Sequence, residues 1–95
     1  MIELTVNGKR VPLSRFPRTI LEATFRAALG TLKGGENLTS AELRVEGTEA
    51  AALVLSGKPA ELDGFARKIL GGLAAGVAGS LHLPETPTTI EIRIE

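Results

Sequence analysis

Apolar and polar residues alternate in three segments of the chain, residues 2–6, 41–46 and 90–94. This period of two is typical of half-buried β-strands. A fourth segment, residues 51–56, is more uniformly apolar and ends at Gly57, which predicts a strand near the centre of a sheet. The pattern therefore predicts four main strands.

The dipeptide Asn7-Gly8 predicts a tight hairpin after the first strand, because this pair favours the type I′ turn. Three pairs of residues then face each other across the turn: Val6 with Lys9, Leu4 with Val11, and Ile2 with Leu13. The apolar members of these pairs share one face. Pro12 marks residues 9–13 as a fifth, short strand at the edge of the sheet.

The first helix is expected to begin near Ser14 and Pro17, which are common at helix starts. It should run to about Lys33 and end at Gly34-Gly35. Its apolar stripe follows helical spacing and consists of Leu21, Phe25, Ala28, Leu29 and Leu32.

The second helix is expected to begin at Pro59, with Glu61 and Asp63 near its positive end. The residues expected to face the core are Leu62, Ala66, Ile69, Leu73, Val77 and Ser80.

Together these elements predict a single α+β domain over residues 1–95, in the order β(β)αββαβ. We expect a two-layer sandwich in which two helices cover one face of a four- or five-stranded sheet. Without the short strand this order is the ferredoxin-like pattern, which uses both sides of the first strand. With the hairpin in place, a β-grasp-like sheet with an added helix fits better, and both alternatives stay open.

The second helix is unusual because residues 69–84 carry no charge, whereas a helix on a small domain normally shows water a charged face. Glycines in helix interiors cost roughly 0.8–1 kcal/mol each relative to alanine. Five glycines fall in this helix: Gly64, Gly71, Gly72, Gly76 and Gly79. Their combined cost of about 4–5 kcal/mol is comparable with the stability of a small domain, so close packing must offset it.

Two kinds of close packing would offset this cost. The helix could pack tightly on the domain's own sheet and first helix, or its outer face could contact a second protein chain. A ligand groove along this face is a third alternative. With the core stripe given above, the outer face carries the candidate interface residues Gly71, Ala74, Ala75 and Ala78. These predict a homodimer or a contact with another protein partner.

Candidate chemistry is sparse. His82 is the only histidine and forms an H-x-x-E pattern with Glu85, but two ligands fall short of a zinc site. The chain has no cysteine, which excludes disulfides and thiolate chemistry. Ser80 lies close to His82 in sequence, yet no nucleophile elbow accompanies the pair. We therefore expect no metal, no cofactor and no catalytic set, although an enzyme using His82, Glu85 or Asp63 stays a third alternative.

Arg15 and Arg18 lie near the start of the first helix, where backbone N–H groups favour anions. They form a possible anion site, and the alternative is a solvated rim.

The charge balance argues against nucleic acid, because eleven basic and eleven acidic residues cancel. The solvent face of the predicted sheet carries five acids and two bases among Glu3, Thr5, Glu42, Arg44, Glu46, Glu91, Arg93 and Glu95. The only aromatic residues are three phenylalanines, all assigned to helices. RNA-binding sheets of this architecture need stacking aromatics and positive charge.

The uncharged run is also too short to cross a membrane. As a helix it rises about 24 Å, against a hydrocarbon core of roughly 30 Å. The chain opens directly on a strand pattern without a secretory signal, and the lack of cysteine agrees with a cytoplasmic location.

Two functions follow from these patterns. The first is a small non-enzymatic interaction domain that self-associates through its second helix. The alternative is a small-molecule or anion-binding regulatory module, with a groove near Gly57 or the Arg15/Arg18 helix end.

Overall fold

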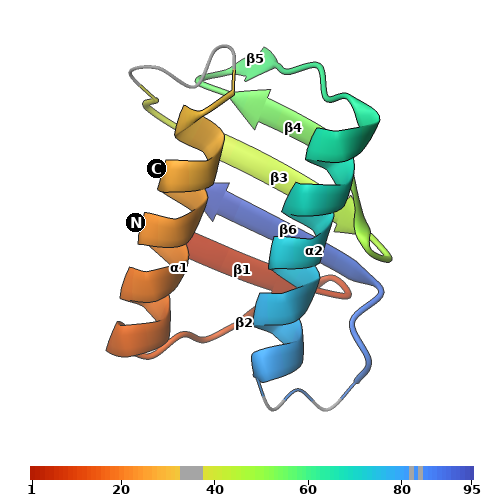
Figure 1. Ribbon diagram of the computed structural model, residues 1–95. Coiled ribbons are helices and arrows are strands. Elements are labelled where there is room, and N and C mark those ends of the chain that lie inside the picture. Colours follow the sequence, from red (N-terminus) through yellow and green to blue (C-terminus); the bar gives the residue numbers. More distant parts are fainter. Residues whose placement is uncertain (33–37, 82, 84) are drawn as a thin grey trace.

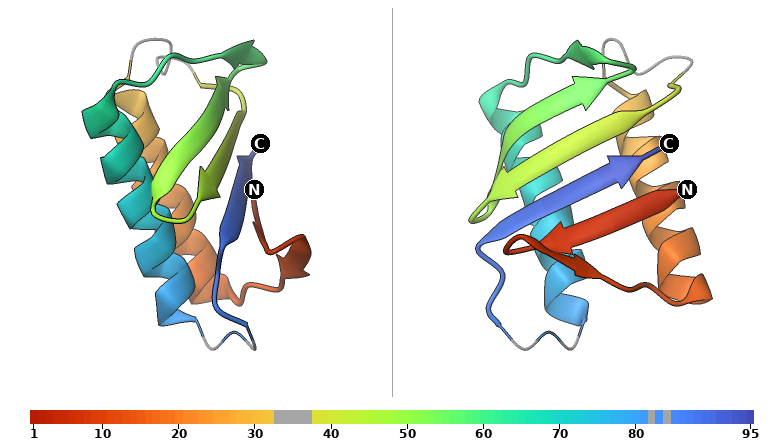
Figure 2. Two further views of the ribbon diagram at one scale, coloured as in Figure 1. Left: turned by 90° about the vertical axis from the view of Figure 1, so that its right-hand side faces the viewer. Right: turned by 180° about the vertical axis from the view of Figure 1, so that it is seen from behind.

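Six strands form one antiparallel sheet, and two helices cover one of its faces (Figures 1 and 2). This holds for residues 1–32, 38–81, 83 and 85–95, which the computed structural model describes. Along the chain the elements are β1 (Ile2–Val6), β2 (Lys9–Val11), α1 (Arg15–Gly30), β3 (Ala41–Glu46), β4 (Glu49–Leu55), β5 (Lys58–Pro59), α2 (Gly64–Ser80) and β6 (Thr89–Ile94). The α+β class and the placement of both helices on one face are confirmed.

The strands lie in the order β2-β1-β6-β3-β4-β5. The last strand, β6, thus lies between β1 and β3, and β2 lies on the other side of β1. The helices run antiparallel to each other across the strands, so that each one spans the sheet (Figure 1).

The predicted hairpin is confirmed. Asn7 and Gly8 both adopt positive φ, 52° and 79°, as a type I′ turn requires. The register pairs Val6 with Lys9 and Leu4 with Val11 as predicted, and β2 lies at a sheet edge. Because β2 ends at Val11, the third expected pair, Ile2 with Leu13, is not part of the ladder.

The prediction of four or five strands is wrong because it missed β5. Ser56 and Gly57 have φ values of 49° and 81°, and they form a tight turn after β4 like the one at Asn7-Gly8. Pro59 therefore belongs to a short edge strand and does not begin α2. The helix starts later, at Gly64, where the Asp63 carboxylate accepts a hydrogen bond of 2.7 Å from the Ala66 amide.

Helix α1 ends at Gly30, earlier than predicted, whereas Lys33, Gly34 and Gly35 lie outside the described residues. Ser14 occupies the N-cap position, but its side chain makes no capping hydrogen bond.

The core lies between the sheet and the helices. It contains the buried stripe of α1 and the predicted inner residues of β6, which are Leu21, Phe25, Leu29, Ile90, Ile92 and Ile94. The prediction that Ile69 belongs to this core is wrong, because 48% of its surface is exposed.

The turn at Asn7-Gly8 generates a test. Gly8→Val should lower the free energy of unfolding by about 1–3 kcal/mol, because a β-branched residue is strained at positive φ. Urea denaturation measures this change. Gly30→Val is the matched control, since Gly30 has open space around it and no positive φ. Equal stability of the two variants would contradict the assigned turn.

Candidate interaction surface

Helix α2 meets the sheet through a narrow face made mostly of small residues. Its buried residues are Leu70, Gly71, Ala74 and Ala78. Gly71, Ala74 and Ala78, three of the four predicted interface residues, therefore lie against the chain's own sheet. The fourth, Ala75, is half-buried. The buried stripe of α2 lies about one residue further along than the predicted core stripe, which corresponds to a rotation of roughly 100° about the helix axis.

The reason for this displacement is a close backbone contact at Gly71. A Cβ atom at this position would lie 2.1 Å from the Thr48 carbonyl oxygen and 2.5 Å from Glu49 Cα. The turn between β3 and β4 thus fills the space that a side chain would need. Nearby, Arg67 Nη1 donates to the Ala50 carbonyl oxygen at 3.0 Å, which links α2 directly to β4.

The opposite side of α2 presents an uncharged outer stripe, defined here as Phe65, Ile69, Gly72, Gly76 and Gly79. Successive members are separated by four, three, four and three residues, so they share one helix face. Phe65 is 75% exposed and Ile69 48% exposed, and the three glycines are exposed as well. A Cβ at any of these glycines would meet no atom within 4 Å.

The fold thus explains Gly71 but none of the three glycines of the outer stripe. Each of these costs about 0.8–1 kcal/mol in a helix interior, and no close contact within the described residues offsets the cost.

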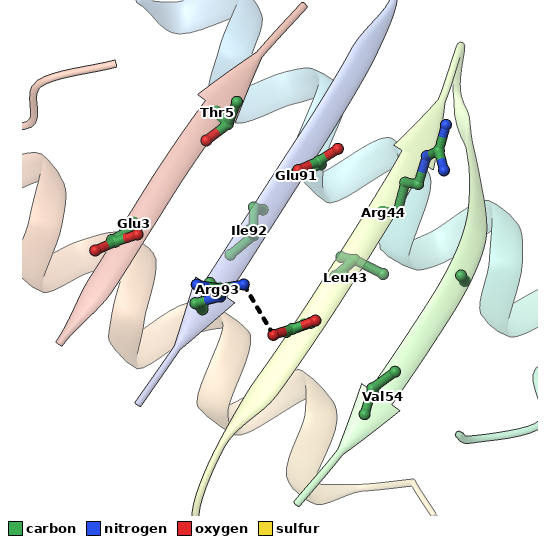
Figure 3. A pocket seen from close by; sticks show the side chains of 10 residues that line it. Glu3, Thr5, Leu43, Arg44, Val54, Glu91, Ile92 and Arg93 are labelled. Carbon is green, nitrogen blue, oxygen red and sulfur yellow. Dashed lines mark ion pairs between the residues drawn. The ribbon is translucent and has the colours of Figure 1, made fainter. Parts of the chain in front are cut away.

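The open face of the sheet, opposite the helices (Figure 2, right), carries ion pairs, unlike the outer stripe of α2. Arg93 reaches from β6 toward β3 (Figure 3) and pairs with Glu42 at 3.1 Å. Arg44 pairs with Glu46 at 3.0 Å. A concavity of about 390 Å³ lies over these strands, and half of the residues that line it are charged. The charged residues of β3 and β6 are exposed on this face, as the alternation predicted, and both of its arginines pair with acids.

Both edges of the sheet are protected against pairing with another strand. The edge strands β2 and β5 are only three and two residues long. Lys9 and Lys58 lie in these strands, and Pro59 in β5 removes a backbone donor. Short edge strands with lysine and proline resist edge-to-edge association.

The outer face of α1 also exposes large apolar residues, but among charges. Phe16 is 75% and Ile20 51% exposed, and Arg15 and Arg18 beside them are exposed too. Arg18 Nη2 donates to the Leu13 carbonyl oxygen at 2.8 Å, which ties it to the turn before α1. The anion site proposed for the two arginines stays a prediction.

Glu85 has a structural role in the described residues. Its carboxylate accepts from Lys9 Nζ at 3.0 Å and from Asn7 Nδ2 at 3.5 Å. The hydrogen bond from Lys9, the positive charge of Lys9 and the bond from Asn7 together lower the pKa of Glu85. His82, its predicted neighbour in the H-x-x-E pattern, lies outside the described residues.

Neither a metal centre nor a membrane span emerges from the part of the chain that the structure describes. No three His, Cys, Asp or Glu side chains gather there as ligands. No helix there is long and apolar enough to cross a bilayer.

Comparison with known proteins adds no family: no family model matches the chain, and no curated protein or solved structure is significantly similar to it.

Two adjacent glycines test the orientation of α2. Gly71→Ala should destabilise the protein by about 1–3 kcal/mol through overpacking against the β3–β4 turn. Gly72→Ala should instead stabilise it by about 0.8–1 kcal/mol, because the exposed position gains helix propensity. Urea denaturation in dilute solution gives both values. A stabilised Gly71→Ala variant together with a destabilised Gly72→Ala variant, or two variants that change stability equally, would contradict the observed rotation of the helix.

Proposed function

We propose that this protein is a small, non-enzymatic interaction domain that self-associates through the outer stripe of α2. The observation that carries the proposal is the exposure of Phe65 and Ile69 in line with three glycines that the fold itself does not require. Exposed apolar patches on small domains commonly mark contact surfaces. Glycines on such a surface let another backbone approach closely.

The other surfaces support the same choice. Burying the open sheet face would desolvate its ion pairs, which is costly unless every charge finds a partner. The short edge strands disfavour strand addition. The outer face of α1 would bring arginines into the contact, whereas residues 69–80 of α2 contain no charge to desolvate.

The distribution of sizes along the outer stripe favours an antiparallel pair of α2 helices. Phe65 and Ile69 lie in its N-terminal half, and Gly72, Gly76 and Gly79 lie in its C-terminal half. A parallel pair would place large residues against large ones and glycines against glycines. An antiparallel pair around a two-fold axis places the large residues of each copy over the glycines of the other. This arrangement fills the space that the glycines leave.

Charge favours the same arrangement. Lys68 is exposed and lies beside the outer stripe. Its neighbour Arg67 points to the sheet instead and donates to the carbonyl groups of Leu62 and Ala50. The last turn of α2 contains no basic residue. An antiparallel pair brings Lys68 toward the partner's α2 C-terminus, where the helix dipole is negative.

Two finer assignments accompany this proposal. We favour a β-grasp-like sheet with an added helix over a ferredoxin-like one, because β2 occupies one side of β1 and β6 the other. We also place the protein in the cytoplasm, which suits a chain without cysteine.

An anion-binding regulatory module is the second candidate function. The observation in its favour is a concavity of about 310 Å³ lined by Arg10, Arg18 and Pro12, among others. Its two guanidinium groups already have acceptors, since Arg10 pairs with Glu3 at 3.2 Å and Arg18 binds the turn before α1. It therefore ranks second, and a thermal-shift series with inorganic phosphate would reveal binding there.

Two equally exposed phenylalanines test self-association. Phe65→Glu should raise the dissociation constant of the dimer by more than about a hundredfold, because it buries uncompensated charge. Phe16→Glu, on α1, is the matched control and should leave association unchanged, since both phenylalanines are 75% exposed. Sedimentation equilibrium measures the constants, and circular dichroism checks folding. A wild-type protein that stays monomeric at high micromolar concentration would refute the proposal.

A spin label tests the direction of packing. The chain has no cysteine, so Ser80→Cys provides a single labelling position at the end of α2, outside the outer stripe. In an antiparallel dimer the two labels should lie roughly 20–30 Å apart along the helix axis, whereas a parallel dimer holds them side by side. Double electron–electron resonance measures the separation. Adjacent labels would reject the antiparallel arrangement while preserving self-association, and adding Phe65→Glu should abolish the coupling.

A further inference from the structure

One side-chain amide joins the β1–β2 turn to the start of β6. Asn7 Oδ1 accepts hydrogen bonds from Thr88 N at 2.8 Å, Thr88 Oγ1 at 2.8 Å and Thr89 N at 3.0 Å. Its Nδ2 donates to the Thr86 carbonyl oxygen at 3.0 Å and to Glu85 Oε2 at 3.5 Å. We call this set of contacts the Asn7 clamp.

We propose that Asn7 is a site of spontaneous deamidation, and that its conversion to aspartate or isoaspartate releases residues 85–88 from the hairpin. The backbone nitrogen of Gly8 loses its proton and attacks Asn7 Cγ, a C–N bond forms, the Cγ–Nδ2 bond breaks, and Nδ2 takes up a proton and leaves as ammonia. Water then opens the resulting five-membered imide at either carbonyl group. No oxidant or other reactant is needed.

The neighbour on the C-terminal side makes Asn7 the reactive asparagine of the chain. Gly8 has no side chain to hinder attack by its own nitrogen. The chain's other asparagine, Asn37, precedes the bulky Leu38, which hinders the same step.

The closed clamp slows the reaction in the folded protein, and the reaction in turn breaks the contacts of the clamp. While Oδ1 holds its three donors, the carboxamide is directed toward Thr88 and Thr89, so the reaction proceeds from molecules in which the clamp is open. After conversion the Nδ2 donor is gone. A carboxylate oxygen in its place would face the Thr86 carbonyl oxygen and the Glu85 carboxylate, which repel it. Isoaspartate also lengthens the backbone within a two-residue turn.

Mass spectrometry and NMR test the proposal on the full chain. Incubation in urea and under native conditions, followed by peptide mapping, measures the conversion of amide to acid at each asparagine. Asn7 should convert faster than Asn37 in urea, and at least about tenfold more slowly in the folded protein than in urea. Thr88→Val, which removes one of the three donors to Oδ1, should speed conversion in the folded protein several-fold and leave the rate in urea unchanged.

The converted protein provides the second measurement. Backbone amide signals of residues 85, 86, 88 and 89 should shift after conversion, and hydrogen exchange at Thr88 and Thr89 should accelerate at least tenfold. Asn7→Asp should reproduce these changes for the aspartate product. Conversion at Asn7 no faster than at Asn37 in urea, or an aged protein with unchanged signals at these four residues, would overturn the proposal.

Discussion

The contact between α2 and the β3–β4 turn at Gly71 determines how the second helix lies on the sheet. With a potential Cβ only 2.1 Å from the Thr48 carbonyl oxygen, the position accepts glycine alone unless the backbone moves. This contact fixes the rotation of the helix about its axis. Ala74 and Ala78, one and two turns further on, consequently lie against the sheet as well. The small residues of α2 thus serve the domain's own packing.

The same rotation turns Phe65 and Ile69 away from the core. A helix packed through its large residues would have left a small, featureless outer surface. Here Phe65, Ile69 and three further glycines lie outside instead, on a face without charge. Because the sheet edges are protected and the open face carries ion pairs, the outer stripe is the surface whose composition the fold leaves unexplained. The proposed self-association would account for both the exposed large side chains and the glycines of the outer stripe.

Much of the architecture could be predicted from local patterns. Alternation identified the main strands, and Asn7-Gly8 set the register of the first hairpin, because both signals depend only on neighbouring residues. Strand β5 was missed since two residues carry no periodicity, and Pro59 resembled a helix start. The strand order was not accessible either, since it depends on contacts between distant segments.

The prediction of which α2 residues face outward failed for a more specific reason. Hydrophobic periodicity weights large residues, so Ile69, Leu73 and Val77 were assigned to the core. The close approach of α2 to the β3–β4 turn leaves no room for a side chain at Gly71. The buried face of α2 is therefore centred on small residues, while Leu73 and Val77 are half-buried at the edge of the core and Ile69 is exposed. The uncharged helix was therefore recognised correctly as unusual, but Ile69 was assigned to the core and Gly71, Ala74 and Ala78 to the outer face, which reverses their positions. A glycine required by a distant backbone looks the same in sequence as one that is exposed.

Contacts between the outer stripes of two copies are what the proposed self-association most directly requires. An isotope-filtered nuclear Overhauser experiment on a mixture of labelled and unlabelled protein detects contacts between copies alone. We expect signals from the side chains of Phe65 and Ile69 in one copy to the α-protons of Gly72, Gly76 or Gly79 in the other. Intermolecular signals confined to the open sheet face or to α1, or none at high protein concentration, would contradict the account.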